Sequence, residues 1–307
     1  MAETKRGKCF LCSEEKELRN SHIIPKFMTK QIREHPSRVY IIDNGLEIKQ
    51  DTIKYYMLCD ECEGKFNKLE TYFSKDIVKN YKNKSIKYSD KLYIFILSVI
   101  WRIMEFRIAT VEQYEKRRYE EALSIKNTIR TFLHIGENLE YQEVYMFILD
   151  SGKEFDFTML ASRKKIKNIT YSIYGRFTNN SNVIRTDCQK DSATNYSLIQ
   201  KMPFTIEKFP FSYFNVFHDD DHKILFVVVE QFIFCFNLLG ESLNFPEQSK
   251  IVPKGGIWED VQFPSKINEY LNRYGEEVNL DTECSEEEIG NILTCLKKKG
   301  IITARPH

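Results

Sequence analysis

Cys9-Phe-Leu-Cys12 and Cys59-Asp-Glu-Cys62 each contain a pair of cysteines. The fold predicted for the N-terminal part of the chain depends on these two pairs. Two residues between ligands allow one tight turn to direct both thiolates at the same ion, and two such turns complete the tetrahedral sphere that Zn²⁺ prefers. The pattern therefore predicts one structural zinc ion held by Cys9, Cys12, Cys59 and Cys62. The alternative is four buried thiols without a metal.

The interpretation as metal ligands depends on a reducing compartment, where disulfides are rare. The residues before Cys9 include no apolar segment of the kind that a secretory signal requires. The longest apolar-rich stretch, Leu92–Met104, is too short to span a bilayer, and it carries Arg102. The sequence therefore predicts a cytoplasmic protein with reduced cysteines and no membrane partner.

The overall composition is that of a folded, nearly neutral protein. The 307 residues include 42% hydrophobic and 29% charged side chains, which excludes an intrinsically disordered chain. Lys+Arg (45) nearly equals Asp+Glu (44), so any binding of nucleic acid requires a local basic patch rather than global attraction. No GxGxxG or GxxxxGK[ST] motif occurs, which argues against a glycine-rich phosphate-binding enzyme.

Three regions are predicted along the chain. Residues 1–75 hold the cysteine pairs, short strand-like runs and a helix from about Cys59 to Phe73. Residues 76–90 are rich in Lys, Asn, Tyr and Ser, and they are predicted to be a connection. Residues 91–307 are predicted to be an accessory domain for sensing, targeting or oligomerisation.

Within the accessory domain, helical and strand patterns occupy separate stretches. Apolar residues from Leu92 to Ile103 recur at three- and four-residue spacing, which predicts helices over residues 90–135. From 141 to 240, runs rich in Val, Ile, Phe and Tyr alternate with turn signals, which predicts strands. Separate helical and strand stretches favour an α+β fold with an antiparallel sheet over alternating βα units.

A motif between the cysteine pairs suggests a family. Asn20-Ser-His-Ile-Ile-Pro25, together with the cysteine pairs and with Leu58-Cys-Asp-Glu-Cys-Glu-Gly-Lys-Phe-Asn-Lys-Leu-Glu70, resembles the zinc-knuckle branch of the HNH (ββα-metal) endonucleases. The resemblance is greatest to a group of bacterial proteins with the pattern CxxC…SHIIP…LCxxCExxFxxxE. It covers roughly residues 7–75, about a quarter of the chain. The resemblance implies a small treble-clef, HNH-like ββα zinc module at the start of the α+β protein.

The resemblance also implies roles for particular residues. Phosphodiester hydrolysis needs an activated water and a metal that stabilises charge on the phosphate and the leaving oxygen. In HNH proteins the general base sits at the end of the first strand of the hairpin, and His22 takes that place; a histidine near its unperturbed pKa of about 6.5 can accept a proton at neutral pH. Glu63 takes the metal-binding place after the last cysteine, and its oxygens suit Mg²⁺ or Mn²⁺. Asn67 and Glu70 follow on the same helix face, where they are expected to complete the metal site or to contact a phosphate through water.

Two departures from the family pattern keep a second interpretation open. Ser21 stands where the family usually has an acidic residue or a histidine that binds the metal, and no counterpart of the middle Asn of the signature can be placed. The chain is therefore either a metal-dependent endonuclease with altered ligands or a catalytically degenerate, zinc-stapled module that binds nucleic acid or protein. Convergence of His22 and Glu63 across an open cleft would favour the endonuclease. A His22 that is buried among apolar groups or bound to zinc would favour the binding module.

Basic residues after His22 predict where nucleic acid binds. Lys26, Lys30 and Arg33 are placed to contact backbone phosphates, although a solvated face also explains such a cluster. DNA is favoured over RNA, and a role in bacterial defence against foreign DNA is suggested by the resemblance alone. Nothing in residues 91–307 names a ligand, so self-association and binding of a partner protein both stay open there.

Overall fold

The computed structural model describes residues 5–29, 40–42, 46–48, 53–110, 123–136, 142–148, 156–166, 169–178, 182–190, 194–202, 212–218, 222–229, 231–240, 242–262 and 264. The chain divides into two compact units. The first unit comprises Met1–Lys30, Asp51–Ile148 and Phe214–Val261, and the second comprises Gln31–Gln50, Leu149–Tyr213 and Gln262–His307.

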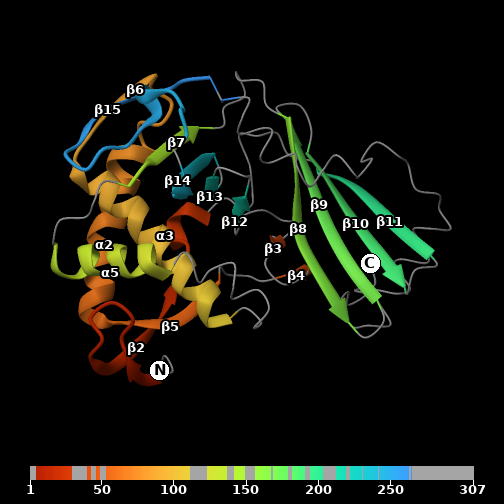
Figure 1. Ribbon diagram of the computed structural model, residues 1–307, viewed down its shortest axis with the longest axis horizontal. Helices are drawn as coiled ribbons and strands as arrows, with labels where there is room; N and C mark the ends of the chain where they lie inside the picture. Colours follow the sequence, from red (N-terminus) through yellow and green to blue (C-terminus); the bar gives the residue numbers. More distant parts are fainter. Residues whose placement is uncertain are drawn as a thin grey trace. The chain divides into compact units, whose positions relative to one another are not determined.

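The first unit begins with three strands and a helix, which are β1 (Lys5–Lys8), β2 (Glu15–His22), β5 (Lys54–Cys59) and α2 (Asp60–Tyr72). The strands form an antiparallel sheet in the order β1-β2-β5, and β2 and β5 are labelled in Figure 1. The turn between β1 and β2 carries Cys9 and Cys12, and β5 leads directly into α2. Asp60, Glu61 and Glu63 lie in the first turn of α2, where carboxylates interact favourably with the positive end of the helix dipole.

Other helical segments are η1 (Lys26–Thr29), which lies between β2 and β5 in the chain, the π-helical η2 (Phe73–Val78), α3 (Asp90–Thr110) and α5 (Leu123–Ile135). Nearly every side chain of α3 from Leu92 to Phe106 is buried, which explains why its sequence is apolar on all sides. Phe73 stacks on Phe95 with ring centroids 4.2 Å apart, so α3 and η2 share one aromatic core.

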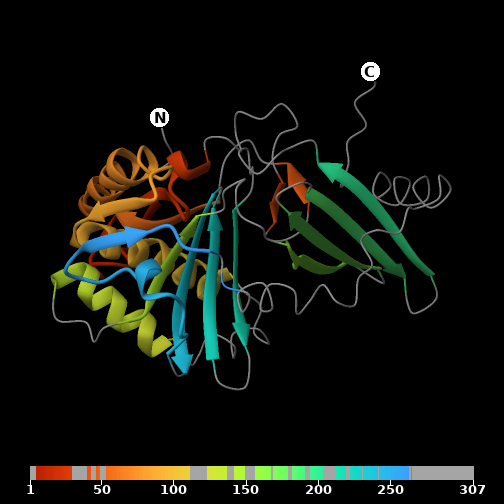
Figure 2. The same cartoon turned by 90° about the horizontal axis from the view of Figure 1, so that it is seen from above.

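A four-stranded sheet completes this core. It is formed by β7 (Val144–Ile148), β12 (Ser212–His218), β13 (His222–Val229) and β14 (Phe232–Gly240), in the order β12-β13-β14-β7. β14 pairs antiparallel with both β13 and β7. Phe232 and Phe234 of β14 make edge-to-face contacts with Phe73. The helices of the first unit lie along one face of this sheet in Figure 2.

The second unit contains two antiparallel sheets, formed by β3 (Tyr40–Ile42), β4 (Leu46–Ile48), β8 (Asp156–Ile166), β9 (Ile169–Thr178), β10 (Asn182–Lys190) and β11 (Thr194–Met202). The last four strands form one sheet in the order β11-β10-β9-β8, and each neighbouring pair is antiparallel. β3 and β4 form a separate hairpin.

The predicted α+β class with antiparallel sheets is confirmed. The predicted helix from about Cys59 to Phe73 corresponds to α2. The predicted region boundaries stay predictions. Residues 76–90, expected to be a connection, include β6 (Ser85–Tyr88), which pairs antiparallel with β15 (Gly256–Glu259). Within the described residues, no helix combines the length and the apolarity needed to span a membrane.

Two buried tyrosines predict a loss of stability at high pH. Burial raises the pKa of Tyr93 and of Tyr145 from 10.0 to about 12. The folded state therefore favours the neutral phenol. The contribution of each tyrosine to the free energy of unfolding is complete below pH 10 and is lost as the pH rises through 12. A pKa shift of this size corresponds to roughly 3 kcal/mol for each residue.

We expect the free energy of unfolding in urea to fall steeply above pH 10, and to fall less steeply in Tyr93→Phe. An identical pH dependence in the variant and the wild type would show that Tyr93 does not contribute. The phenol of Tyr93 also donates a hydrogen bond to the Gln142 carbonyl (3.2 Å), so the comparison is made on the slope with pH and not on the absolute stability.

Candidate functional site

The four cysteines of the predicted zinc site converge. Their Sγ atoms all lie within 4.8 Å of one another, and those of Cys12 and Cys59 are 3.9 Å apart. In a tetrahedral site with Zn–S distances of about 2.3 Å, two sulfurs lie about 3.8 Å apart. All four residues are free thiols. The donor set and its spacing therefore fit a structural metal ion such as zinc.

Backbone hydrogen bonds shape the first cysteine turn. The Cys9 N–H donates to the Glu14 carbonyl (2.9 Å), and the Ser13 N–H donates to the Cys9 carbonyl (2.8 Å), so the turn closes on itself. Ser13 has a φ of 65°, a left-handed conformation that is uncommon for a residue other than glycine. The Phe10 N–H donates to the Met57 carbonyl (2.8 Å), which fixes the turn on β5.

The surroundings of the thiols change their proton affinity. Burial raises the pKa of Cys9 and of Cys62. Burial also acts to raise the pKa of Cys12, but the Glu14 backbone N–H and the other cysteine side chains outweigh it, and the pKa is lowered. Because zinc binds thiolates, a zinc ion bound at this cluster would displace protons, and its affinity would fall as the pH decreases.

The end of β2 meets the first turn of α2. The Ser21 hydroxyl donates a hydrogen bond to Glu63 Oε2 at 2.6 Å, and Ser21 is buried while Glu63 is half-buried. The neighbouring His22 is also half-buried. Among the described residues, the only cluster of potential metal ligands consists of the four cysteines and does not include His22. Strand β2, which is expected to carry the general base, and helix α2, which is expected to carry the metal ligand, are therefore in contact through Ser21 and Glu63.

A buried arginine holds the strand that carries His22. Arg102 of α3 is 1% exposed, and its Nη1 donates to the His22 carbonyl at 3.0 Å and to Glu70 Oε1 at 2.9 Å. Its guanidinium also lies 5.3 Å from the centre of the Phe66 ring, within the range of a cation–π interaction. Arg102 thus ties the end of β2 to α2, and one carboxylate oxygen of Glu70 has a structural partner.

Removal of Glu70 is expected to destabilise the fold strongly. Glu70→Ala leaves the guanidinium of Arg102 buried without its counterion, and breaking such a pair costs about 3–5 kcal/mol. Asn67→Ala, an exposed position on the same helix, is the matched control and should cost within about 0.5 kcal/mol. The measurement is urea unfolding of both variants. Equal stability of the two variants would mean that the ion pair with Arg102 is not structural.

The other residues predicted for the site are placed as follows. Asn67 is exposed on α2, and its backbone carbonyl accepts a hydrogen bond from Thr71 Oγ1 at 2.8 Å. Lys26 is exposed on η1. Lys30 and Arg33 lie outside the described residues. The roles of these residues in binding nucleic acid or metal stay predictions.

Sequence reasoning missed the role of Arg102. A signal was present, because an arginine inside the apolar run Leu92–Met104 must find a partner when the helix is buried. Its partners could not be identified from the sequence, because His22 lies 80 residues away and Glu70 lies 32 residues away.

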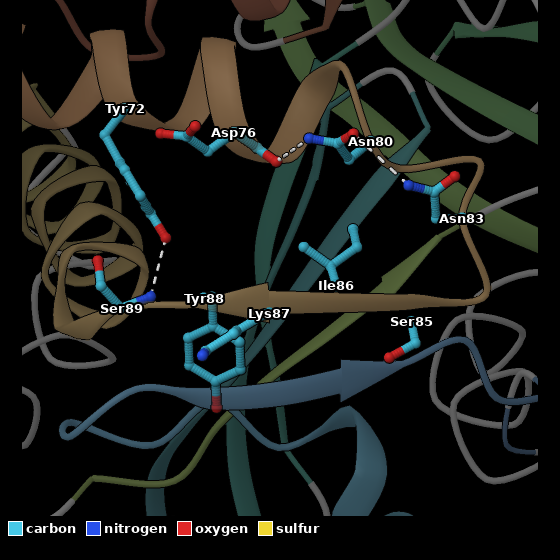
Figure 3. A pocket seen from close by; sticks show the side chains of 9 residues that line it. All are labelled: Tyr72, Asp76, Asn80, Asn83, Ser85, Ile86, Lys87, Tyr88 and Ser89. Atoms are coloured by element: carbon cyan, nitrogen blue, oxygen red, sulfur yellow. Dashed lines mark hydrogen bonds between the residues drawn. The ribbon is translucent and has the colours of Figure 1, made fainter.

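A polar groove of about 470 Å³ lies between η2 and β6 (Figure 3). Several of its polar groups bond to other groups of the chain. The Tyr72 hydroxyl accepts the Ser89 N–H at 3.0 Å, and Asn80 Nδ2 donates to the Asp76 carbonyl at 2.8 Å. These bonds explain the groove as a structural junction between η2 and β6.

No family model matches the chain, and neither the search of curated proteins nor that of solved structures finds a match. The fold and the site together support an α+β protein with a four-cysteine cluster that could hold a structural metal ion.

Proposed function

We propose that this chain is an HNH-type, metal-dependent endonuclease, in which a zinc-stapled treble-clef module hydrolyses phosphodiester bonds. The observation that supports this proposal most directly is the 2.6 Å contact between Ser21 and Glu63. These are the two positions that bind the catalytic metal in the family that the sequence resembles. They come together because β2, its antiparallel partner β5, and α2 form a ββα unit next to the cysteines.

In this proposal His22 accepts the proton of the attacking water. Its half-buried side chain keeps part of its surface in solvent, and the bond from Arg102 to its carbonyl fixes the end of the strand. Imidazole side chains are commonly suited to this step at neutral pH.

A divalent ion is proposed to be held by Glu63, with Asn67 one helical turn further along. The oxygen donors of these residues fit Mg²⁺ or Mn²⁺, which stabilises charge on the phosphate when bound. Glu70 is the weaker candidate ligand, because its Oε1 already accepts a hydrogen bond from Arg102.

Nucleic acid is the proposed substrate, with DNA favoured over RNA. Lys26 is exposed and follows His22 by four residues, and its ammonium group is proposed to contact a phosphate near the scissile bond. Lys30 and Arg33 continue the same basic cluster in the sequence. Bacterial defence against foreign DNA is the proposed biological role, and residues 91–307 are proposed to supply targeting or self-association.

A second candidate function is a zinc-stapled binding module without catalytic activity. One observation favours it: Glu70, a candidate metal-binding carboxylate, already accepts a hydrogen bond from Arg102. Ser21 also offers a neutral hydroxyl where the family usually supplies a charged or imidazole ligand. In this alternative the ββα unit would bind nucleic acid or protein and leave it intact.

Incubation of the full-length protein with plasmid DNA and with RNA distinguishes the two functions. We expect cleavage with Mg²⁺ or Mn²⁺, inhibition by EDTA, and recovery on addition of Mg²⁺ alone, because the labile ion is distinct from the structural zinc. Binding of either nucleic acid in a gel-shift assay, without cleavage under any of these conditions, would support the second function and contradict the first.

A further inference from the structure

A second arginine, Arg130 of α5, reaches the first cysteine turn. Its Nε donates to the Phe10 carbonyl at 2.7 Å and to the Leu11 carbonyl at 3.0 Å, and its Nη2 donates to Ser13 Oγ. Phe10 and Leu11 are the two residues between Cys9 and Cys12. One guanidinium therefore spans the whole loop that directs these two thiolates.

The contacts act on the part of the loop that sets ligand direction. Both carbonyls belong to the residues that separate the two thiols, so a shift of either one rotates a cysteine away from the cluster. The third contact holds Ser13, whose left-handed backbone closes the turn. Groups that hold the ligands of a metal are often as important for affinity as the ligands themselves.

Charge gives a second reason for an arginine at this place. Four thiolates around one Zn²⁺ carry a net charge of −2, and a guanidinium is charged at every accessible pH. A cation bonded to the loop therefore offsets part of this charge when the metal is bound. The fork of the guanidinium also reaches three acceptors at once, which an ammonium group on a flexible stem does not reproduce.

The same face of α5 is also fastened to the body of the first unit. Lys126, four residues before Arg130, forms a buried ion pair with Glu105 of α3 at 2.8 Å. Ile129 is fully buried in the core. α5 is thus connected both to the cysteine turn and to the central helix.

We propose that Arg130 is a positioning residue of the four-cysteine metal site, and that zinc binding and the docking of α5 are coupled through it. Coupling of this kind is reciprocal: the factor by which docked α5 increases zinc affinity is the factor by which zinc favours docked α5. The proposal depends on the metal site and is independent of any nuclease activity.

The first test is the zinc dissociation constant of the full-length chain, measured by competition with a chromophoric chelator. Removal of a group that holds metal ligands typically weakens affinity about 10- to 100-fold, and we expect this range for Arg130→Gln. Arg130→Lys keeps the charge but loses the fork, so it should recover only part of the loss.

Arg19→Gln is the matched control. Arg19 lies next to the second cysteine pair, but it is 51% exposed and pairs with the Asp60 side chain at 2.7 Å rather than with the backbone of a cysteine turn. Its zinc affinity should stay within about twofold of the wild type, since surface ion pairs contribute little. Wild-type affinity in a folded Arg130→Gln, or full recovery in Arg130→Lys, would overturn the positioning role.

Hydrogen exchange of the wild-type chain tests the coupling without any substitution. When zinc is removed, amides of α5 (Leu123–Ile135) should lose more protection than amides of α3 between Leu92 and Phe106. If Arg130→Gln does not fold, this comparison decides alone. Equal protection of α5 with and without zinc would overturn the coupling.

Discussion

Replacement of Cys62 by serine is expected to release the zinc and to unfold the N-terminal part of the first unit. Structural zinc contributes about 10–16 kcal/mol of apparent binding free energy near neutral pH, which is as large as the stability of a whole domain. A serine hydroxyl does not replace a thiolate as a zinc ligand. Cys62 also lies in the first turn of α2 beside buried core residues, so loss of the metal loosens the helix as well.

The expected result for Cys62→Ser is less than about 0.1 equivalents of zinc per chain, loss of the cooperative thermal transition of the N-terminal region, and rapid proteolysis there. Cys235→Ser is the control, because Cys235 is buried in β14 and takes no part in the cysteine cluster. It should lose stability from the buried hydroxyl but keep its zinc. A Cys62→Ser variant with wild-type zinc content and melting temperature would contradict a metal site at these residues.

Replacement of His22 by alanine is expected to reduce the rate of nucleic-acid cleavage about 10²- to 10⁴-fold, the usual cost of removing a general base. Zinc content and the unfolding transition should change little, because the strand end is held through the His22 backbone carbonyl, which alanine retains. Glu63→Ala should also lose activity, and excess Mg²⁺ or Mn²⁺ should restore part of it if the ion is held by further oxygen donors.

Asn20→Ala provides the control for this experiment, because Asn20 is an exposed residue of the same strand. It should cleave at the wild-type rate. Cleavage by His22→Ala as fast as by the wild type would remove His22 from the mechanism. Loss of activity with an equal loss of zinc would indicate instead that His22 supports the fold of the module.

The cysteine cluster could be predicted from the sequence because its four members are marked by local spacing. Two CxxC turns specify their own geometry, and the structure brings all four sulfurs together. The helix after the second pair was also predictable, since the first turn is rich in carboxylates and the following residues are helical in pattern. The α+β class followed from the separation of helical and strand stretches.

The contacts around the site could not be predicted, because they depend on strand register and on packing. Ser21 touches Glu63 only because β2 pairs with β5 across an irregularity between Arg19 and Asn20, which the sequence does not reveal. Arg130 reaches Phe10 across 120 residues, and no local pattern distinguishes this arginine from a solvated one. Long-range side-chain partners of this kind are fixed by the tertiary fold.

The central claim is that one zinc ion, bound by Cys9, Cys12, Cys59 and Cys62, organises the N-terminal module. X-ray absorption spectroscopy combined with metal analysis of the purified full-length chain tests it most directly. We expect one equivalent of zinc per chain with four sulfur neighbours at about 2.3 Å. A chain without zinc whose four thiols react freely with a thiol reagent in the folded state, or a zinc ion bound by nitrogen and oxygen, would contradict the claim.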